Sequence, residues 1–294
     1  MRADAECYIC CRNKVISLME QYNIESQKRE QTLNEVDQYL QQNSMENSAP
    51  ELLGDVLGIL ERITGIQGGY ARQKRKYNQL LLSMYSQLER QVKAQKSPLY
   101  AALQYALVGN YIDFGAMDDV YVEKLEELLD KRKTFVIDEQ EYLHFCGELS
   151  NAKSLVYLTD NAGEIVTDRL LIETILHHYP DVKVTVIVRG NEVLNDATLE
   201  DVKDVQFDER IAVMTNGVCF PGTPLERVPE KVRTMVGQAD LCIAKGQGNF
   251  ESLCGCGHNI YYLFLCKCQM FVNRFQVSQF APVVKNEKRL CNFN

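Results

Sequence analysis

The amino-acid sequence predicts an α/β protein with a Rossmann-like, mainly parallel sheet, helices on both sheet faces, and a helical N-terminal domain in front. Two observations support this. Apolar residues recur at helical spacing up to about residue 150, and from residue 151 short apolar runs alternate with helical segments. The chain has 294 residues, enough for one large domain or two modest ones. We therefore expect a helical domain over 1–150 and an α/β domain over 151–294.

Amphipathic segments follow one another through the first half of the chain. Four stretches have apolar residues on one helical face: 11–22, 52–65, 77–94 and 120–133. The second stretch ends at Gly65, which suits a helix C-cap, and Pro98 follows the third. The first 150 residues are therefore expected to form helices.

Five short apolar runs, mostly rich in Val, Ile, Leu or Tyr, mark the expected strands. They lie at 154–159, 183–188, 211–214, 240–244 and 260–265. Helical segments separate most of them, which is typical of a mainly parallel sheet covered on both faces.

Composition excludes some classes of function. The net charge of −8 argues against a broad nucleic-acid-binding surface, and the basic run at 72–76 is more typical of a solvated helix face. No apolar run approaches the roughly 20 residues of a membrane helix. The N-terminus lacks a secretion signal, so we expect a cytoplasmic protein whose eleven cysteines are mostly reduced thiols. The oligomeric state stays open.

Polar, glycine-containing stretches follow four of the five expected strands. They are TDNAGE (159–164), RGNEVLNDAT (189–198), TNGVCFPGT (215–223) and KGQGNFE (245–251). Turns after strands favour Asn, Asp and Gly in any protein, so one such stretch means little. Four at the carboxyl edge of one parallel sheet predict a ligand site there.

The side chains in these stretches suit a metal-bound phosphate ester. Asp160, Asn161 and Asp196 supply hard oxygen ligands, which favour Mg²⁺ or Mn²⁺. Lys245 supplies a positive charge, and the backbone N–H groups from Gly246 to Asn249 can cradle an anion.

Each of these residues also has a structural interpretation. Asp160, Asn161 and Asp196 can cap helices, and Lys245 can lie on the surface. Glu164 can bind a substrate hydroxyl or orient water, or it can simply favour the helix dipole.

Other motifs are incomplete. The stretch GQGNFE lacks the third glycine of a dinucleotide fingerprint, and neither a P-loop nor a G-x-S-x-G elbow occurs. Cys7 and Cys10 have the C-x-x-C spacing found in zinc sites. The pairs Cys254/Cys256 and Cys266/Cys268 do not have this spacing. We interpret Cys7 and Cys10 as core thiols, with a metal or redox role as the alternative.

Taken in order, these motifs resemble the damage-control phosphatases, a family also described as domain of unknown function eighty-nine, in its stand-alone archaeal and bacterial branch. The C-x-x-C at Cys7, GGYARQKRKYN at 68–78 and VGNYIDFG at 108–115 also look like that family. The chain departs from it at Gly68-Gly69-Tyr70, where members often have Asp-Pro-Tyr.

The resemblance implies a function and a set of site residues. It implies that one divalent ion (manganese, cobalt, nickel or magnesium) is bound by Asp160, Asn161 and Asp196. It implies small phosphate esters as substrates, including sugar phosphates and damaged metabolites. It matches Lys245 to the phosphate-contacting lysine, and Asn110 and Asp113 to a motif that reaches the site.

These inferences combine into one hypothesis, a metal-dependent phosphomonoesterase. Asp160, Lys245 and Glu164 are the expected catalytic residues. The expected substrate-binding residues are Asn110, Asp113, Thr215, Asn216, Lys245, Gly246, Gly248 and Asn249. Attack by water and attack by Asp160 through an aspartyl-phosphate both stay open. Two alternatives are an S-adenosylmethionine-dependent carboxyl methyltransferase and a non-catalytic protein that binds a phosphorylated metabolite.

Overall fold

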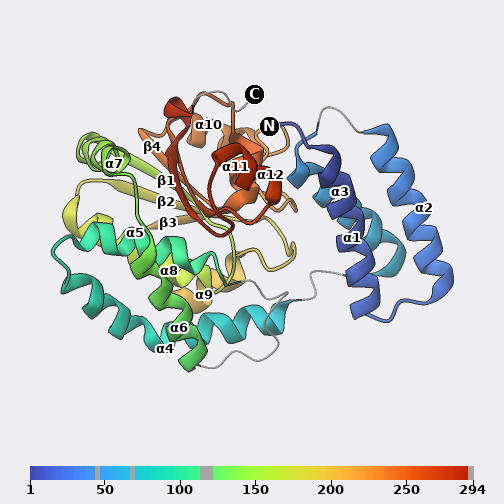
Figure 1. Ribbon diagram of the computed structural model, residues 1–294, viewed down its shortest axis with the longest axis horizontal. Coiled ribbons are helices and arrows are strands. Elements are labelled where there is room, and N and C mark those ends of the chain that lie inside the picture. Colours follow the sequence, from blue (N-terminus) through green and yellow to red (C-terminus); the bar gives the residue numbers. More distant parts are fainter. Residues whose placement is uncertain (44–46, 67–69, 113–121, 291–294) are drawn as a thin grey trace.

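A twisted sheet forms the centre of the computed structural model, which describes residues 1–43, 47–66, 70–112 and 122–290 (Figure 1). Its strands are β1 Ser154–Leu158, β2 Lys183–Val188, β3 Ala212–Thr215, β4 Leu241–Lys245, β5 Ile260–Leu265 and β6 Pro282–Asn286. The strand order is β3-β2-β1-β4-β5-β6, and only the β5–β6 pair of this sheet is antiparallel. The five expected strands are confirmed. Strand β6 was not predicted, because it begins at a proline and carries only two consecutive valines.

The topology creates a crevice where the strand order reverses. Strand β1 pairs with β2 on one side and with β4 on the other, so the chain leaves β1 and β4 in opposite directions. The loops that follow these two neighbouring strands therefore face each other across a switch point, the usual ligand site of open parallel sheets.

Helices cover both faces of the sheet, which confirms the predicted fold class. The first seven are α1 Ala5–Gln21, α2 Ser26–Gln42, α3 Ala49–Thr64, α4 Ala71–Lys93, α5 Pro98–Gly109, α6 Val122–Asp130 and α7 Glu139–Asn151. The others are α8 Glu164–His178, α9 Leu199–Val205, α10 Glu230–Gln238, α11 Gly246–Leu253 and α12 Gln269–Phe275. Gly65 ends α3 in a left-handed conformation, as its sequence position predicted.

Alternate strand residues enter two separate apolar layers. Leu155 and Tyr157 of β1 pack in the layer that contains α4, α5 and α8, on the lower side of Figure 1. Val156 and Leu158 pack in the other layer, against residues of α10, α11 and α12. Because successive strand side chains point to opposite faces, β1 is buried on both sides. The division of the chain into domains at residue 150 stays a prediction.

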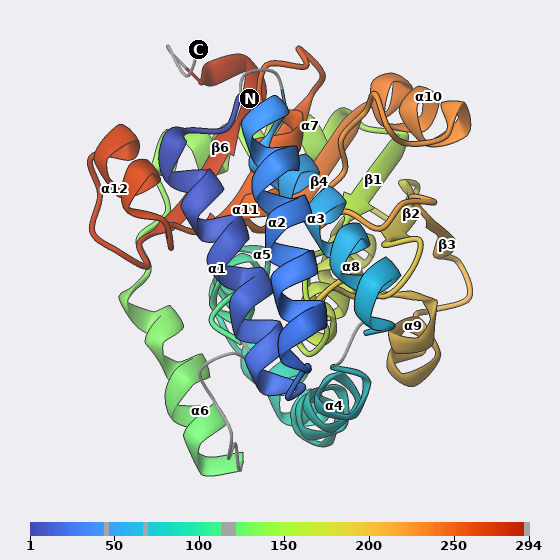
Figure 2. The ribbon, with the colours of Figure 1, turned by 90° about the vertical axis from the view of Figure 1, so that its right-hand side faces the viewer.

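Helices α1, α2 and α3 form a unit, here called the cap, beside the carboxyl ends of the strands (Figures 1 and 2). Helix α3 holds the cap to the rest of the chain, where Asp55 forms an ion pair of 3.0 Å with Arg227. The preceding residue, Gly54, lies against the ring of Phe220 so closely that an added Cβ would stand 2.1 Å from a ring carbon. The cap therefore docks through a contact that only glycine permits.

No helix within the described ranges is long and apolar enough to cross a membrane.

Two glycines of α3 provide a matched test of this docking. Gly58→Ala has open space and should stabilise the protein by about 0.5–1 kcal/mol through the lower entropy of the unfolded chain. Gly54→Ala gains the same helix propensity but must displace Phe220, and should destabilise the protein by about 1–3 kcal/mol. Urea unfolding of both variants measures the difference. Equal effects would show that the contact between α3 and Phe220 is loose.

Candidate active site

Two loops are joined at the carboxyl edge of the sheet. Asn161, after β1, and Asp196, after β2, form an isolated antiparallel bridge. On either side, the Ala197 N–H donates to the Asp160 carbonyl at 2.7 Å, and the Ala162 N–H donates to the Asn195 carbonyl at 2.9 Å. Backbone pairing therefore brings the three predicted metal ligands together, although Asp196 lies 36 positions after Asp160 in the sequence.

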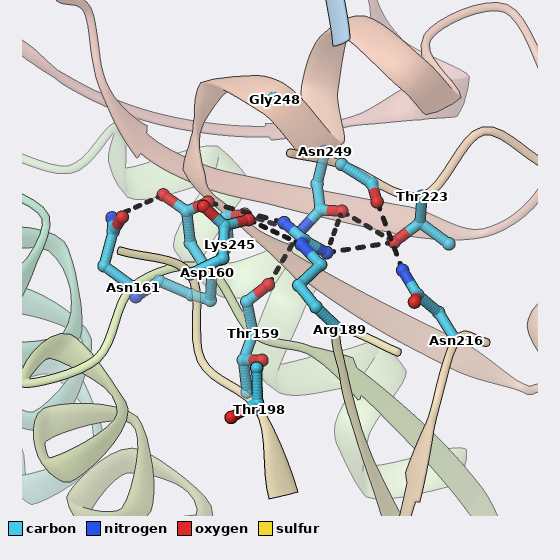
Figure 3. Close-up of polar contacts among 12 residues, drawn as sticks. Thr159, Asp160, Asn161, Arg189, Thr198, Asn216, Thr223, Lys245, Gly248 and Asn249 are labelled. Atoms are coloured by element: carbon cyan, nitrogen blue, oxygen red, sulfur yellow. Dashed lines mark hydrogen bonds and ion pairs between the residues drawn. The ribbon is translucent and has the colours of Figure 1, made fainter. Parts of the chain in front are cut away.

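Arg189, the residue after β2, links the carboxylates of Asp160 and Asp196. Figure 3 shows its guanidinium group beside Asp160. Its Nε donates to Asp196 at 2.6 Å, and one terminal nitrogen lies 3.5 Å from Asp160. Its other terminal nitrogen donates to Thr223 and Asn249. Arg189 is 1% exposed, so it holds the loops from within the protein. Arg189 was not predicted from the sequence, and its position at the start of the second polar stretch (189–198) is the signal that could have identified it.

Side-chain amides hold Asp160 from the other side. The Nδ2 atoms of Asn161 and Asn110 donate to one Asp160 oxygen at 2.7 and 3.1 Å. Both amides also donate to Glu164, at 2.8 and 2.9 Å. Because the amide nitrogen of Asn161 makes both of its bonds, its amide oxygen remains the atom suited to a ligand.

The site carries more negative charge than its surroundings neutralise. Burial raises the pKa of Asp160 well above its usual range, and repulsion from Asp196 and Glu164 adds to the effect, while Arg189 only partly opposes it. Burial also raises the pKa of Asp196, in spite of the hydrogen bond from Arg189. A cation beside these oxygens would relieve the repulsion.

This donor set fits a hard divalent ion. Two carboxylates and one amide oxygen leave positions for water and substrate, as Mg²⁺ and Mn²⁺ sites commonly do. Within the described ranges no three His, Cys, Asp or Glu side chains form a metal-binding group, so the amide of Asn161 is needed to complete the set. The three predicted ligands therefore fit the ion, and binding itself stays a prediction.

Gly246, at the start of α11, allows Asp160 to lie against the helix. Its φ is +79°, and an added Cβ would stand 2.1 Å from an Asp160 carboxylate oxygen. Only glycine gives both the left-handed conformation and the room. The N-terminus of α11 thus lies beside the carboxylate, where the helix dipole favours negative charge.

Lys245 lies behind these residues in a fully buried ion cluster. Its Nζ donates to Glu164 at 2.7 Å, to Asp168 at 2.6 Å and to the Ala106 carbonyl at 2.8 Å. Burial opposes the charge on the lysine, yet its two carboxylate partners raise its pKa to about 12. Glu164 keeps a lowered pKa, because Lys245 and the two amides outweigh the effect of its burial. The three N–H donors of Lys245 are matched by three protein acceptors.

A pocket of about 370 Å³ opens onto the carboxylates. Asp160, Asn161 and Asp196 line one side, with Gly248 of α11 and Lys267, which follows β5. Lys267 also lowers the pKa of Asp160, against the larger effect of burial. Residues of the cap helices α1 and α3 line the other side. The pocket thus joins a charged sheet edge to the cap.

Residues 3–283 match the damage-control phosphatase ARMT1-like domain. This chain belongs to the damage-control phosphatase ARMT1-like family. The family resemblance of the sequence motifs is therefore confirmed.

Archaeal relatives of this family cover most of the chain. A protein of Methanocaldococcus jannaschii named uncharacterized protein MJ0202 is 30% identical over 90% of this chain and 88% of its own length. The damage-control phosphatase PH1575 of Pyrococcus horikoshii is 27% identical over 98% of this chain and 99% of its own length. A damage-control phosphatase of Archaeoglobus fulgidus is 35% identical over 70% of this chain and 72% of its own length.

A solved member of the family has the same fold. The crystal structure of PH1575 from Pyrococcus horikoshii, described as a DUF89 family protein, superposes with a TM-score of 0.86 at 26% identity. The match covers 98% of this chain and 99% of that one.

The other family motifs take different places around the pocket. Asn249 and Asn216 are both buried. Asn249 accepts a hydrogen bond from Arg189, and Asn216 bonds to the backbone of residues 190, 218 and 222. Among described residues, neither they nor Thr215 line the pocket, and their role in substrate binding stays a prediction. Asp113, Gly68 and Gly69 lie outside the described residues.

Two further expectations concern charged and thiol side chains. Lys74 is not part of a solvated face, because it is 2% exposed and forms ion pairs of 2.9 Å with Asp201 and with Glu192. That expectation was wrong for Lys74. Cys7 is buried as expected of a core thiol, but Cys10 is exposed, and both line the pocket as free thiols.

Glu251, in the pocket wall on α11, should make stability depend on pH. Burial raises its pKa from 4.5 to about 7, against a hydrogen bond from Gln247. The folded protein then holds this proton more tightly, so the contribution is full below pH 4.5 and is lost as pH rises through about 7. Glu251→Gln should therefore gain stability over the wild type between pH 5 and 8, by about 1–3 kcal/mol.

Urea unfolding at several pH values measures this gain. Glu226→Gln, at an exposed position, is the matched control and should leave the pH dependence unchanged. A constant difference between Glu251→Gln and the wild type across this range would contradict the assignment.

Proposed function

We propose that this chain is a metal-dependent phosphomonoesterase that acts on small phosphorylated metabolites. The observation that carries the proposal is the pair of carboxylates, the half-buried Asp160 and the buried Asp196, which line a pocket together with Lys267. The names of two relatives, both damage-control phosphatases, support the same activity.

Asp160, Asn161 and Asp196 would hold one divalent ion, with manganese, cobalt, nickel and magnesium as candidates. When bound, such an ion supplies positive charge to a phosphate oxygen and lowers the pKa of coordinated water. Arg189 keeps the two carboxylates in place, since it contacts both from a buried position.

Glu164 and Lys245 act behind the site as positioning residues. Glu164 accepts from both Asn161 and Asn110, so it fixes the amide of a metal ligand. Lys245 keeps Glu164 ionised in its buried position. A direct contact between Lys245 and phosphate would require one of its three protein hydrogen bonds to break.

Lys267 is a better candidate than Lys245 for the lysine that neutralises the charge of the phosphate. It lines the pocket, and its charge is felt at Asp160. Gly248, near the N-terminus of α11, lines the same side, where a backbone N–H can approach an anion. Together these groups would neutralise charge that develops on the transferred phosphoryl group. Asp160 as nucleophile and water as nucleophile remain two versions of this proposal.

The first test is phosphate release with each of the four metals and with EDTA. Release should need a divalent ion, vanish with EDTA, and fall in Asp160→Asn by more than the roughly 10–100-fold that outer-shell changes cost. Asp181→Asn, at an exposed position before β2, is the matched control and should behave as wild type. Saturable S-adenosylmethionine binding without metal would instead favour the methyltransferase, and tight phosphate-ester binding without turnover would favour a binding protein.

The second test separates the two lysines. Lys267→Met should lower kcat/KM by about 100-fold without unfolding the protein, because it removes one charge beside the reacting group. Lys245→Met should destabilise the fold by about 3–5 kcal/mol, because Glu164 and Asp168 lose their buried partner. Lys231→Met, exposed on α10, is the control for both. Unchanged kcat/KM in Lys267→Met would remove Lys267 from the phosphate site.

A further inference from the structure

The part of the pocket wall that α3 supplies is apolar. Helix α3 contributes Ala49, Pro50 and Leu53 to the lining. Outside the cap, Met270 of α12 and Pro221 add further apolar surface to the same pocket. A phosphate held beside Asp160 would therefore direct the organic part of its ester toward these side chains.

Leu194 adds to this wall from a strained backbone position. Its φ is +48°, in the left-handed region that leucine rarely adopts. It lies two residues before the predicted ligand Asp196 and lines the pocket. Glycine or asparagine would suit this backbone better. Strain of this kind persists where the surrounding structure imposes it, commonly at functional sites, and here its effect is an apolar side chain at the pocket.

The thiols in the wall are also weakly polar. Cys7 and Cys11 of α1 line the pocket, and burial raises their pKa values to about 11 and about 12. They are therefore neutral near pH 7 and present sulfur as soft, nearly apolar surface. Charged groups of the cap at the pocket are Glu6 and Lys14, both on α1.

Such a wall matches some phosphate esters poorly. A sugar phosphate would bury several hydroxyl groups against apolar side chains, and each unpaired hydroxyl costs binding energy. An alkyl or aryl chain would instead remove apolar surface from water on both partners.

We propose that the cap side of this pocket selects phosphate esters whose organic part has an apolar alkyl or aryl face, rather than sugar phosphates. This inference rests on the proposed phosphatase function. It narrows the expected substrates, because α3 and Leu194 bring apolar side chains to the place where a sugar would need polar partners.

The test compares hexyl phosphate with glucitol 6-phosphate, which have equal carbon counts and a primary ester each. We expect kcat/KM to be at least tenfold higher for hexyl phosphate. Within a series of straight-chain alkyl phosphates, KM should fall about fourfold for each methylene that becomes buried, until the pocket is full. A wild type that prefers glucitol 6-phosphate would overturn the inference.

Two leucines of α3 supply a matched pair of variants. Leu53→Asn changes the pocket wall and should lower the preference for hexyl phosphate by about tenfold. Leu57→Asn lies one turn further along α3, where it lines a separate cavity of about 70 Å³, and should keep the wild-type preference. Equal preferences in both variants would contradict a role of the wall.

Binding of hexylphosphonate and methylphosphonate, which cannot release phosphate, separates the two proposals. If no ester is hydrolysed while hexylphosphonate still binds more tightly and depends on Leu53, the phosphatase proposal fails and the apolar wall stands. If esters are hydrolysed but neither chain length nor Leu53 alters affinity, the phosphatase proposal stands and the apolar wall fails.

Discussion

A buried lysine ties the two loops of the switch point to the helix that follows the central strand. Lys245 ends β4, and its ammonium lies between Glu164 and Asp168 in the first turns of α8. All three side chains are fully buried, so each carboxylate depends on the charge of Lys245, and burial still raises the pKa of Asp168 to about 7. Tyr157 of β1 completes the cluster by donating to Asp168 at 2.8 Å. Strands β1 and β4 are thereby fixed to α8 at the sheet edge where open parallel sheets usually bind their ligands.

This buried cluster also fixes the positions of the side chains nearer the pocket. An ionised Glu164 can accept from Asn161 and Asn110, and these two amides in turn hold Asp160. Arg189 holds the opposite side of the same carboxylate. Burial nevertheless raises the pKa values of Asp160 and Asp196 against the effect of Arg189, so their ionised forms would gain from a bound cation. A cation that binds only the folded protein would stabilise it by mass action, so metal binding and folding should be thermodynamically linked.

The sequence predicted the parts of the site that depend on local patterns. Apolar runs marked five strands, and the carboxyl ends of parallel strands meet at one edge, so Asp160, Asn161 and Asp196 could be brought together from sequence alone. The burial of Lys245 depends on a pairing between distant segments. A weaker signal was present, because Glu164 and Asp168 are spaced by four and lie on one helical face with Leu171, Ile172 and Ile175.

Other features could not be predicted, because their partners are far apart in sequence. Lys74 looks like a surface lysine within a basic run, and its burial depends on Asp201, more than a hundred residues later. The apolar pocket wall likewise depends on contacts between segments that are far apart in the sequence. Leu53 lies on an amphipathic helix whose apolar face predicts only burial, and docking of the cap through Gly54 and Phe220 places it opposite the carboxylates.

The charged residues of the site come from the sheet edge and the apolar wall comes largely from the cap, and this division has a consequence for function. The residues proposed to act on phosphate lie on loops that the sheet and the buried ion cluster hold in place, so their geometry has little room to vary. The opposite wall comes largely from the cap, which docks through a tight glycine contact and a surface ion pair. Changes in α1 and α3 can therefore alter which organic groups fit without disturbing Asp160, Asp196 or Arg189. In such an arrangement, substrate choice is expected to depend on the cap and on Leu194, and catalysis on the sheet edge.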